Sequence, residues 1–190
     1  VSSANYQFTL EGTVSGSVAN RSCHTLKSTD QGATWGSEVT VRDYATDSRP
    51  YYESKLVKLD TGNLLCVHRC AANTPGTHYI STSTDSGATW GAPASQFTGY
   101  GAPSTTQASW GTLVTVTRRN SDAACIAYAS IDRGATWLSA VTLDATMYEM
   151  EYGCAVQTLD SRWLIVYGYQ PTSSITNSDI KQIYLTEGHS

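Results

Sequence analysis

The phrase Ser28-Thr-Asp-Gln-Gly-Ala-Thr-Trp35 returns as Ser83-Thr-Asp-Ser-Gly-Ala-Thr-Trp90 and again as Ser130-Ile-Asp-Arg-Gly-Ala-Thr-Trp137. The first residues of successive copies are 55 and then 47 positions apart. A period of that size indicates stacked blades or solenoid units rather than one irregular domain. In each copy we expect the Asp to accept hydrogen bonds from backbone N–H groups a few residues on, and the Gly to take a positive φ. The Trp should bury its ring under the turn while its indole N–H keeps a polar partner.

The composition narrows the class of protein. The 190 residues suffice for one sizeable core and divide awkwardly into two domains. Charged residues make up only 15%, the net charge is -4 and the Lys and Arg residues are scattered, so no basic surface for nucleic acid is expected. No apolar run approaches a membrane span, and no charged-then-apolar leader supports secretion. Twelve Tyr and five Trp against two Phe are typical of extracellular or virion-surface β proteins that handle sugars.

The five cysteines form an odd, irregularly spaced set, which does not indicate a disulfide framework. Cys66 and Cys70 lie four positions apart and offer no zinc-ligand spacing with a second pair. Cys66, Cys125 and Cys154 stand in apolar strand contexts, so we expect them to be small buried hydrophobes. Reduced thiols fit folding in a cytosol. The sequence shows no ligand cluster, and no metal or organic cofactor is expected.

Between the repeated phrases the chain reads as strand, tight turn, strand, strand, phrase, strand, with no helical periodicity. This pattern predicts an all-β fold of roughly four four-stranded blades, at about 5–43, 52–98, 102–143 and 152–190, within one domain. The first unit adds a strand around 6–10 to its last two strands. We expect these blades to be part of a larger propeller. The alternative is a compact four-bladed ring in which the strand at 6–10 completes the last blade.

Two candidate catalytic residues occupy equivalent places in different blades. If the first strand of a blade runs from one face of the molecule to the other, its start lies on the same face as the end of the second strand. Glu53 stands nine residues before the turn residue Gly62, and Tyr152 stands nine before Ser161. Both should therefore lie on the face opposite the hairpin turns and the repeated phrase, near the axis of the blades.

Arginines end the second strands on that same face. Arg69 and Arg118 each stand seven residues after a turn glycine, Gly62 and Gly111. Arg119 is the other candidate in the third unit, and because side chains alternate along a strand only one of the pair can face the axis. The sequence predicts a mouth with a carboxylate, two arginines and a tyrosine.

The phrase S-x-D-x-G-x-T-W resembles the Asp-box, or BNR, repeat of the sialidase superfamily. That resemblance implies a six-bladed β-propeller, which would need about 300 residues at this period. The segment 53–69 resembles the sialidase segment in which an active-site Glu precedes an arginine of the carboxylate-binding triad. The segment 152–168 resembles the one that opens with the nucleophilic Tyr, but the family's Glu at its end is replaced by Gly168 or Tyr169.

The resemblance implies a role for each candidate. Arg69, with Arg118 or Arg119, would hold the sugar carboxylate through paired charge-assisted bonds. Glu53 would be a general acid or base, and Tyr152 the nucleophile or a stabiliser of the oxocarbenium ion. Each has a structural alternative, since Arg69 and Glu53 could simply pair with each other and Tyr152 could pack under a neighbouring blade. The family's acidic Asp and first triad arginine have no clear match and are expected in blades before Val1.

The chain is similar to the propeller of phage tailspike endosialidases. The similarity rests on the two arginines and the Glu, together with the lack of a clear partner Glu for the Tyr. The segment 100–111 and the free cysteines suit that branch. We therefore expect a glycosidase that cleaves α2,8-linked polysialic acid, located on the virion tail and assembled as a homotrimer with further blades of its own chain. The alternatives are an exo-sialidase, in which Glu149 or Glu151 could replace the missing Glu, and a glycan-binding propeller without catalysis.

Overall fold

The computed structural model describes residues 6–13, 21–70, 76–119, 121–173 and 178–186. These residues form fourteen strands and one short helix, α1 (Tyr44–Asp47). The strands in chain order are β1 (Tyr6–Thr13), β2 (Arg21–Ser28), β3 (Val39–Arg42), β4 (Tyr51–Lys58), β5 (Leu64–Cys70), β6 (Thr77–Ser83), β7 (Ala94–Thr98), β8 (Ser104–Gln107), β9 (Leu113–Arg118), β10 (Cys125–Ser130), β11 (Val141–Asp144), β12 (Glu149–Gln157), β13 (Trp163–Gln170) and β14 (Asp179–Leu185).

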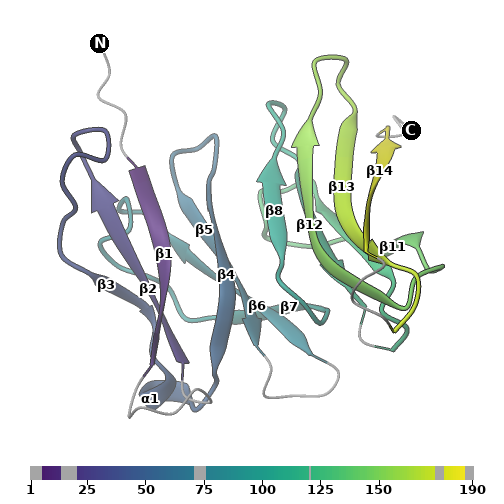
Figure 1. The fold of residues 1–190 in the computed structure, drawn as a ribbon. Helices are drawn as coiled ribbons and strands as arrows, with labels where there is room; N and C mark the ends of the chain where they lie inside the picture. Colours follow the sequence, from purple (N-terminus) through teal and green to yellow (C-terminus); the bar gives the residue numbers. More distant parts are fainter. Residues whose placement is uncertain (1–5, 14–20, 71–75, 120, 174–177, 187–190) are drawn as a thin grey trace.

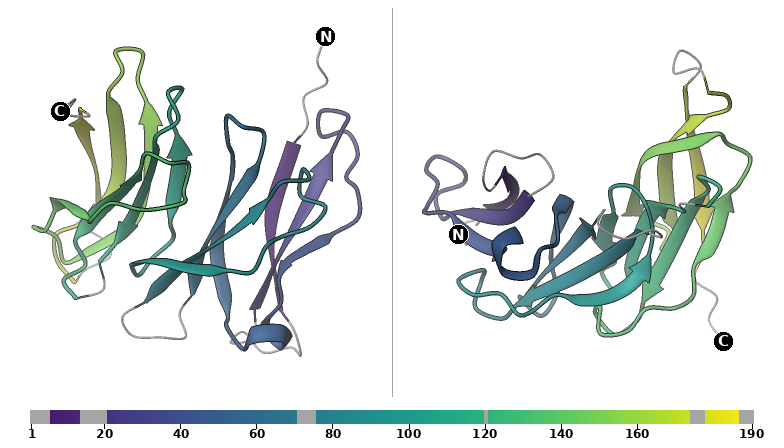
Figure 2. Two further views of the ribbon diagram at one scale, coloured as in Figure 1. Left: turned by 180° about the vertical axis from the view of Figure 1, so that it is seen from behind. Right: turned by 90° about the horizontal axis from the view of Figure 1, so that it is seen from below.

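The strands form four antiparallel sheets that follow one another along the chain (Figure 1). Their strand orders are β1-β2-β3, β4-β5-β6-β7, β8-β9-β10-β11 and β12-β13-β14. The expected succession of four blades is confirmed; among the described residues the first and last sheets have three strands each. Seen along the strands, the sheets are arranged round an arc (Figure 2). Strand β1 pairs with β2 and not with β14, so it does not complete the last blade as the compact-ring alternative required.

Each apolar core lies between two neighbouring sheets, because the sheets pack face to face. Valines and isoleucines of β5 and β6, such as Val67 and Ile80, meet Leu113 and Ile126 of the third sheet. A second cluster joins the third sheet to Trp163 and its neighbours in the fourth. The central strands β5 and β9 are buried on both faces, and in β9 the buried positions alternate between valines and threonines.

The repeated phrase folds as a turn held by its own side chains. In the third copy, Ser130 Oγ donates to Asp132 Oδ1 at 2.8 Å and accepts from the Gly134 N–H at 2.8 Å. The Asp132 carboxylate accepts from the Thr136 N–H at 2.8 Å and from the Thr136 hydroxyl at 2.6 Å. Gly134 has φ 91° and the residue before it, Arg133, has φ 60°. The expected Asp bonds and positive-φ Gly are confirmed.

The tryptophans of the phrase depart from one expectation. Trp137 packs against Phe97, with ring centroids 5.0 Å apart, and Trp90 packs against the core between the first two sheets. Their indole Nε1 atoms are buried and have no hydrogen-bond partner among the described residues. The expectation that the N–H keeps a polar partner is therefore wrong for these two rings. Trp35 is 37% exposed.

Strand register separates the two ends of the sheets. Ser83, at the start of the second phrase, pairs with Leu64 at the hairpin end, whereas Arg69 pairs with His78 at the other end of the same strands. In the third sheet Ser130 pairs with Leu113. The phrases and hairpins share one end, the box end, and the first residues of β4 and the last of β5 and β9 share the other, the mouth. The predicted strand order and the opposite placement of the tryptophans are confirmed.

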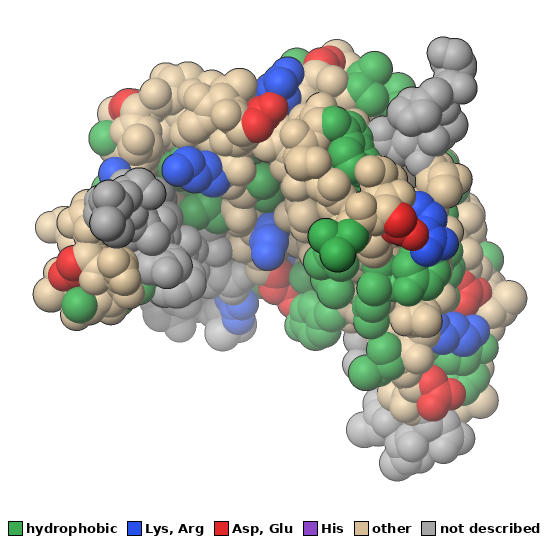
Figure 3. Space-filling model, turned by 90° about the horizontal axis from the view of Figure 1, so that it is seen from above, with side chains coloured by type: hydrophobic (Ala, Val, Ile, Leu, Met, Phe, Trp, Pro, Cys, Tyr) green, Lys and Arg blue, Asp and Glu red, His purple; other side chains and the backbone are tan. Residues whose placement is uncertain are grey.

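Charged side chains on the box end form ion pairs, one between two blades and one within a hairpin. Arg133 donates to both oxygens of Asp60 at 2.7 Å, which links the third phrase to the hairpin of the second sheet. Arg162 pairs with Asp160 in the fourth hairpin, at 2.6 Å. Viewed from this end, basic and acidic side chains lie as scattered spots rather than as one patch (Figure 3).

The cysteines and the helix complete the description. Cys66 and Cys125 are buried as expected, but Cys154 is exposed, because it lies on the last sheet, on which no further described sheet packs. Its expected burial is therefore wrong.

Within the described ranges no helix is long and apolar enough to cross a membrane.

Candidate active site

Two β-bulges place the candidate catalytic residues at the mouth. The pairing of β4 with β5 shifts register between Tyr52 and Lys55, and Glu53 lies inside that shift with φ 40°. The pairing of β12 with β13 shifts in the same way between Met150 and Gly153, around Tyr152. A bulge re-aims a side chain and is often found beside active sites, and a positive φ is strained for a residue with a Cβ. Glu53 and Tyr152, which the sequence spacing placed at equivalent positions, thus also share a β-bulge.

Glu53 joins two sheets that are not neighbours. Its Oε1 accepts a hydrogen bond of 2.9 Å from the hydroxyl of Tyr152, 99 residues later in the chain. Its Oε2 accepts from Arg69 Nη1. The Glu53 and Arg69 side chains are about a quarter exposed, at 28% and 22%, whereas Tyr152 is 64% exposed. The second and fourth sheets therefore contribute the two halves of one hydrogen-bonded group.

Arg118, not its neighbour Arg119, lies beside this group. Arg118 pairs with Glu149 and also donates to the Met150 carbonyl at 3.3 Å. Arg119 instead pairs with Asp122, with Nε at 2.8 Å, and donates to Thr142 at the edge of the third sheet. Because side chains alternate along the strand end, only one of the two arginines faces the mouth, as expected, and it is Arg118.

Two tyrosine rings lie close to the arginines of the mouth. The Tyr100 ring centroid lies 4.9 Å from the guanidinium carbon of Arg69 and 4.8 Å from that of Arg118. On the other side of Arg69, the Tyr52 ring lies 5.8 Å from its guanidinium carbon and 4.8 Å from that of Arg21. Guanidinium groups at these distances from aromatic rings are attracted to the negative ring face. The mouth thus contains a cluster of three arginines and two tyrosines, in which each tyrosine ring lies close to two guanidinium groups.

A buried histidine supports the loop that carries Tyr100. The Tyr100 N–H donates to the Arg118 carbonyl at 2.6 Å, and His78 Nε2 lies 3.1 Å from the Gly101 carbonyl oxygen. Gly99 leaves room for the His78 ring, because a Cβ there would overlap it. Burial, with the nearby Arg69 charge, lowers the pKa of His78 to about 4, although its bond to Gly101 acts in the other direction. A neutral His78 is therefore part of the support of the mouth.

The charges of the mouth are internally balanced. Burial lowers the pKa of Arg69, but the ion pair with Glu53 and the nearby Tyr100 outweigh it and the pKa is raised. Each central arginine has a carboxylate partner, Glu53 for one and Glu149 for the other. An arginine fork can bind a further carboxylate, and a phenol beside a carboxylate can lose its proton to it. Anion binding and nucleophilic attack are the chemistry that this arrangement allows.

The structure brings together four residues that the sequence singled out, Glu53, Arg69, Arg118 and Tyr152, and adds supporting residues that the sequence did not indicate. Tyr100 was named only as part of a segment, and Tyr52 and Arg21 were not singled out. Glu149 was considered a partner for Tyr152, but it pairs with Arg118, and the side chain of Glu151 lies outside the described residues. Tyr52 directly precedes Glu53 and pairs with Arg69 across β4 and β5, and this register is the signal that could have found it.

The structure also brings together three residues that the sequence kept apart. Cys23, Cys66 and His68 are buried with their potential ligand atoms within 4.8 Å of one another. These three side chains form a potential ligand cluster that the sequence did not indicate. Linear spacing could not reveal it, because Cys23 belongs to the first sheet and the other two to the second.

Solved structures with the same architecture include several glycosidases. The NanB sialidase of Streptococcus pneumoniae aligns with a TM-score of 0.68 at 16% identity, over 95% of this chain and 29% of that one. The intramolecular trans-sialidase of Ruminococcus gnavus gives 0.63 at 14% identity, over 95% and 40%. The α-L-arabinanase of Penicillium chrysogenum gives 0.68 at 16% identity, over 95% and 58%.

At these identities the likeness concerns the fold, a sialidase- and arabinanase-type β-propeller. The chain spans less than two thirds of the length of each of these proteins. A comparison with curated protein sequences gave no match. The model of the BNR repeat-like domain matches residues 7–182, which is nearly the whole chain. With its three repeated turns and its successive antiparallel sheets, the chain belongs to the BNR repeat-like domain family.

Proposed function

We propose that the chain carries part of a sialidase active site in which Tyr152 is the nucleophile and Glu53 the base that takes its proton. The observation that carries this proposal is the 2.9 Å hydrogen bond from Tyr152 to Glu53, flanked by Arg69 and Arg118. A phenol with an ordinary pKa near 10 is a weak nucleophile, and an adjacent carboxylate activates it. Sialidases are the glycosidases that use a tyrosine in this way.

The two arginines fit the ligand that such a reaction requires. A sialic acid carries a carboxylate on its anomeric carbon, so a group that holds the carboxylate also positions the reacting atom. Arg69 and Arg118 are both at the mouth, with their guanidinium carbons 4.9 and 4.8 Å from the centroid of the Tyr100 ring. Planar guanidinium groups bind carboxylates through two parallel bonds, which the point charge of a lysine cannot copy.

In the proposed reaction, Tyr152 Oη forms a bond to the anomeric carbon while the bond to the leaving oxygen breaks. The phenolic proton passes to Glu53, and the leaving oxygen takes a proton from a further acid or from water. Water then attacks the anomeric carbon and gives its proton to the conjugate base of that acid. The bond to Tyr152 breaks, and Glu53 returns the proton to the phenolate, so both residues end as they began.

Endo-acting cleavage of α2,8-linked polysialic acid is the second candidate. One reason for that prediction was the lack of a partner Glu for the tyrosine, and the contact between Glu53 and Tyr152 removes that reason. The presence of a third cation, Arg21, beside the Tyr52 ring that Arg69 also contacts favours an extended acidic ligand. The tailspike branch, its virion location and its trimeric assembly stay predictions from the sequence.

The test uses the full-length protein and two substrates, a fluorogenic glycoside of a single sialic acid and α2,8-linked polysialic acid. We expect Tyr152→Phe and Glu53→Gln each to lower the rate on the single sialoside by about 10²–10⁴-fold, the range of general acid–base help. Tyr184→Phe is the matched control, because Tyr184 lies on β14, away from the mouth, and its ring packs against the guanidinium of Arg162. It should keep the wild-type rate.

Other results would redirect the proposal. Cleavage of the polymer that survives Tyr152→Phe but not Glu53→Gln would favour the endo-acting enzyme without a tyrosine nucleophile. A wild-type protein that binds sialylated ligands and turns over neither substrate would be a glycan-binding propeller.

A further inference from the structure

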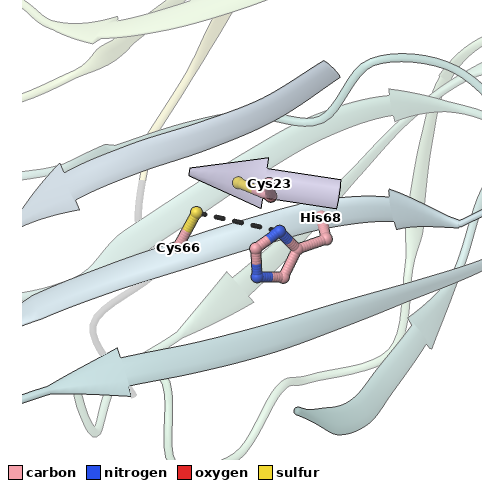
Figure 4. Close-up of side chains that lie close together, drawn as sticks. All are labelled: Cys23, Cys66 and His68. Atoms are coloured by element: carbon pink, nitrogen blue, oxygen red, sulfur yellow. Dashed lines mark hydrogen bonds between the residues drawn. The ribbon is translucent and has the colours of Figure 1, made fainter. Parts of the chain in front are cut away.

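Three side chains able to bind a soft metal ion meet between the first and second sheets. Cys23 comes from β2, and Cys66 and His68 come from β5. All three are fully buried, and they point toward one another (Figure 4). The arrangement is independent of the proposed catalytic group, which uses the neighbouring Arg69 but neither cysteine.

The separations suit a metal ion. Zinc binds cysteine sulfur at about 2.3 Å and histidine nitrogen at about 2.0–2.1 Å, so the two ligand atoms on one ion lie about 3.5–3.8 Å apart. Cys66 Sγ and His68 Nδ1 are 3.8 Å apart. All three potential ligand atoms lie within 4.8 Å of one another.

The surroundings of His68 are those of a metal-binding imidazole. Its Nε2 lies 3.1 Å from Ser81 Oγ, so an N–H on that nitrogen has an acceptor. Metal-binding histidines commonly fix their orientation through such a bond on the second ring nitrogen. Nδ1 then carries the lone pair and faces Cys66. Ser54 Oγ, 2.9 Å from Nδ1, is placed to supply an oxygen as fourth ligand.

The charge count identifies the class of ion. Two thiolates and one neutral imidazole cancel the charge of a divalent ion, which suits a site with no exposed atoms. Thiolate and imidazole together favour zinc over magnesium or calcium, which prefer oxygen ligands. We propose that Cys23, Cys66 and His68 bind one Zn²⁺ ion that joins the first two sheets. The ion would also brace β5 one residue before Arg69.

The main test measures metal in protein refolded under reducing conditions with one equivalent of Zn²⁺ or Co²⁺ and then dialysed. We expect one ion per chain by elemental analysis, and thiolate-to-cobalt charge-transfer absorption in the Co²⁺ form. Cys23→Ser and Cys66→Ser should lose both signals. The controls Cys125→Ser and Cys154→Ser remove a buried and an exposed cysteine outside the site, and both should keep the signals.

A milder variant covers the case in which the serine variants fail to fold. Ser81→Ala removes only the bond to His68 Nε2, and we expect the zinc dissociation constant to rise about 10–100-fold. Folded, reduced wild-type protein that keeps no metal would overturn the proposal. A disulfide between Cys23 and Cys66, found by mass spectrometry of the protein purified without reductant and persisting when zinc is present, would overturn it too. Metal content that stays unchanged in Cys23→Ser and in Cys66→Ser would also overturn it.

Discussion

The box end and the mouth of the sheets are built on opposite plans. At the box end each turn is closed by residues within six positions of one another, as Ser130, Asp132 and Thr136 are, and the same turn is made three times. At the mouth the key contact joins Glu53 to Tyr152 across 99 positions and occurs once. Local, repeated contacts can stabilise every blade alike. A unique site needs contacts that only the assembled blades provide.

The largest expected effect concerns a glycine of the box end. Gly134 has φ 91°, and a Cβ there would overlap the side chain of Leu65, which is fully buried. Gly134→Ala should lower the free energy of unfolding by about 2–5 kcal/mol, from left-handed strain of about 1–2 and overpacking of about 1–3 kcal/mol. Gly32→Ala is the matched control, since Gly32 has φ 87° but its nearest neighbour is 3.8 Å away.

Gly32→Ala should therefore cost only the strain, about 1–2 kcal/mol. Urea unfolding of both variants measures the difference. Equal losses would mean that the phrase is stabilised wholly within itself and that its packing on the second sheet adds nothing.

The next effect concerns the mouth. Arg69→Lys should weaken binding of a sialylated ligand about tenfold or more, because losing a charge-assisted bond costs about 1.5–3 kcal/mol. Stability should change little, since Lys can keep a pairing with Glu53. Arg119→Lys is the control from a neighbouring strand end, with its partner Asp122 at the sheet edge. Isothermal titration with a sialoside compares the three proteins. An equal affinity in wild type and Arg69→Lys would remove Arg69 from the binding site.

The smallest effect separates the two ends by pH. The pKa of His78 is lowered to about 4, mainly by burial, so the unfolded chain binds a proton that the folded chain does not between about pH 6.5 and 4. Stability from this group is present above about pH 6.5 and is lost as the pH falls toward 4. Hydrogen bonds from the box threonines and serines lower the pKa of Asp30, Asp85 and Asp132 from 3.8 to about 2.

The stability contributed by these carboxylates is present above about pH 4 and is lost between about pH 4 and 2. The mouth should therefore lose stability first on acidification. Urea unfolding between pH 7 and 3 checks this: His78→Gln should flatten the slope above pH 4, and Asp132→Asn the slope below it. A slope above pH 4 that His78→Gln leaves unchanged would contradict the account.

The sequence predicted the fold well because its signals are local. The Asp-box turns, the turn glycines Gly62 and Gly111 with φ 88° and 100°, and the strand order all follow from neighbours in the chain. The equivalent positions of Glu53 and Tyr152 followed from counting within hairpins. The assumption that side chains alternate along each strand and that hairpins keep a regular register was enough to predict the turns, the strand order and these positions.

Contacts between sheets could not be read in that way. The partner of Tyr152 was sought at the end of its own hairpin, at Gly168 or Tyr169, but it is Glu53, two sheets earlier in the chain. The bulge at Glu53 and the loop position of Tyr100 change where side chains point, and neither has a fixed periodicity. The same reason hid the meeting of Cys23 with His68.

The pairing of each central arginine with a glutamate also bears on how a ligand arrives. With Arg69 matched to Glu53 and Arg118 to Glu149, the centre of the mouth has little net charge, and the whole chain carries -4. Long-range attraction therefore does little to steer an anionic sugar, and its association rate should depend weakly on ionic strength. For the proposed sialylated ligand, selection would take place at contact, where the ligand carboxylate would compete with those glutamates for the same guanidinium groups.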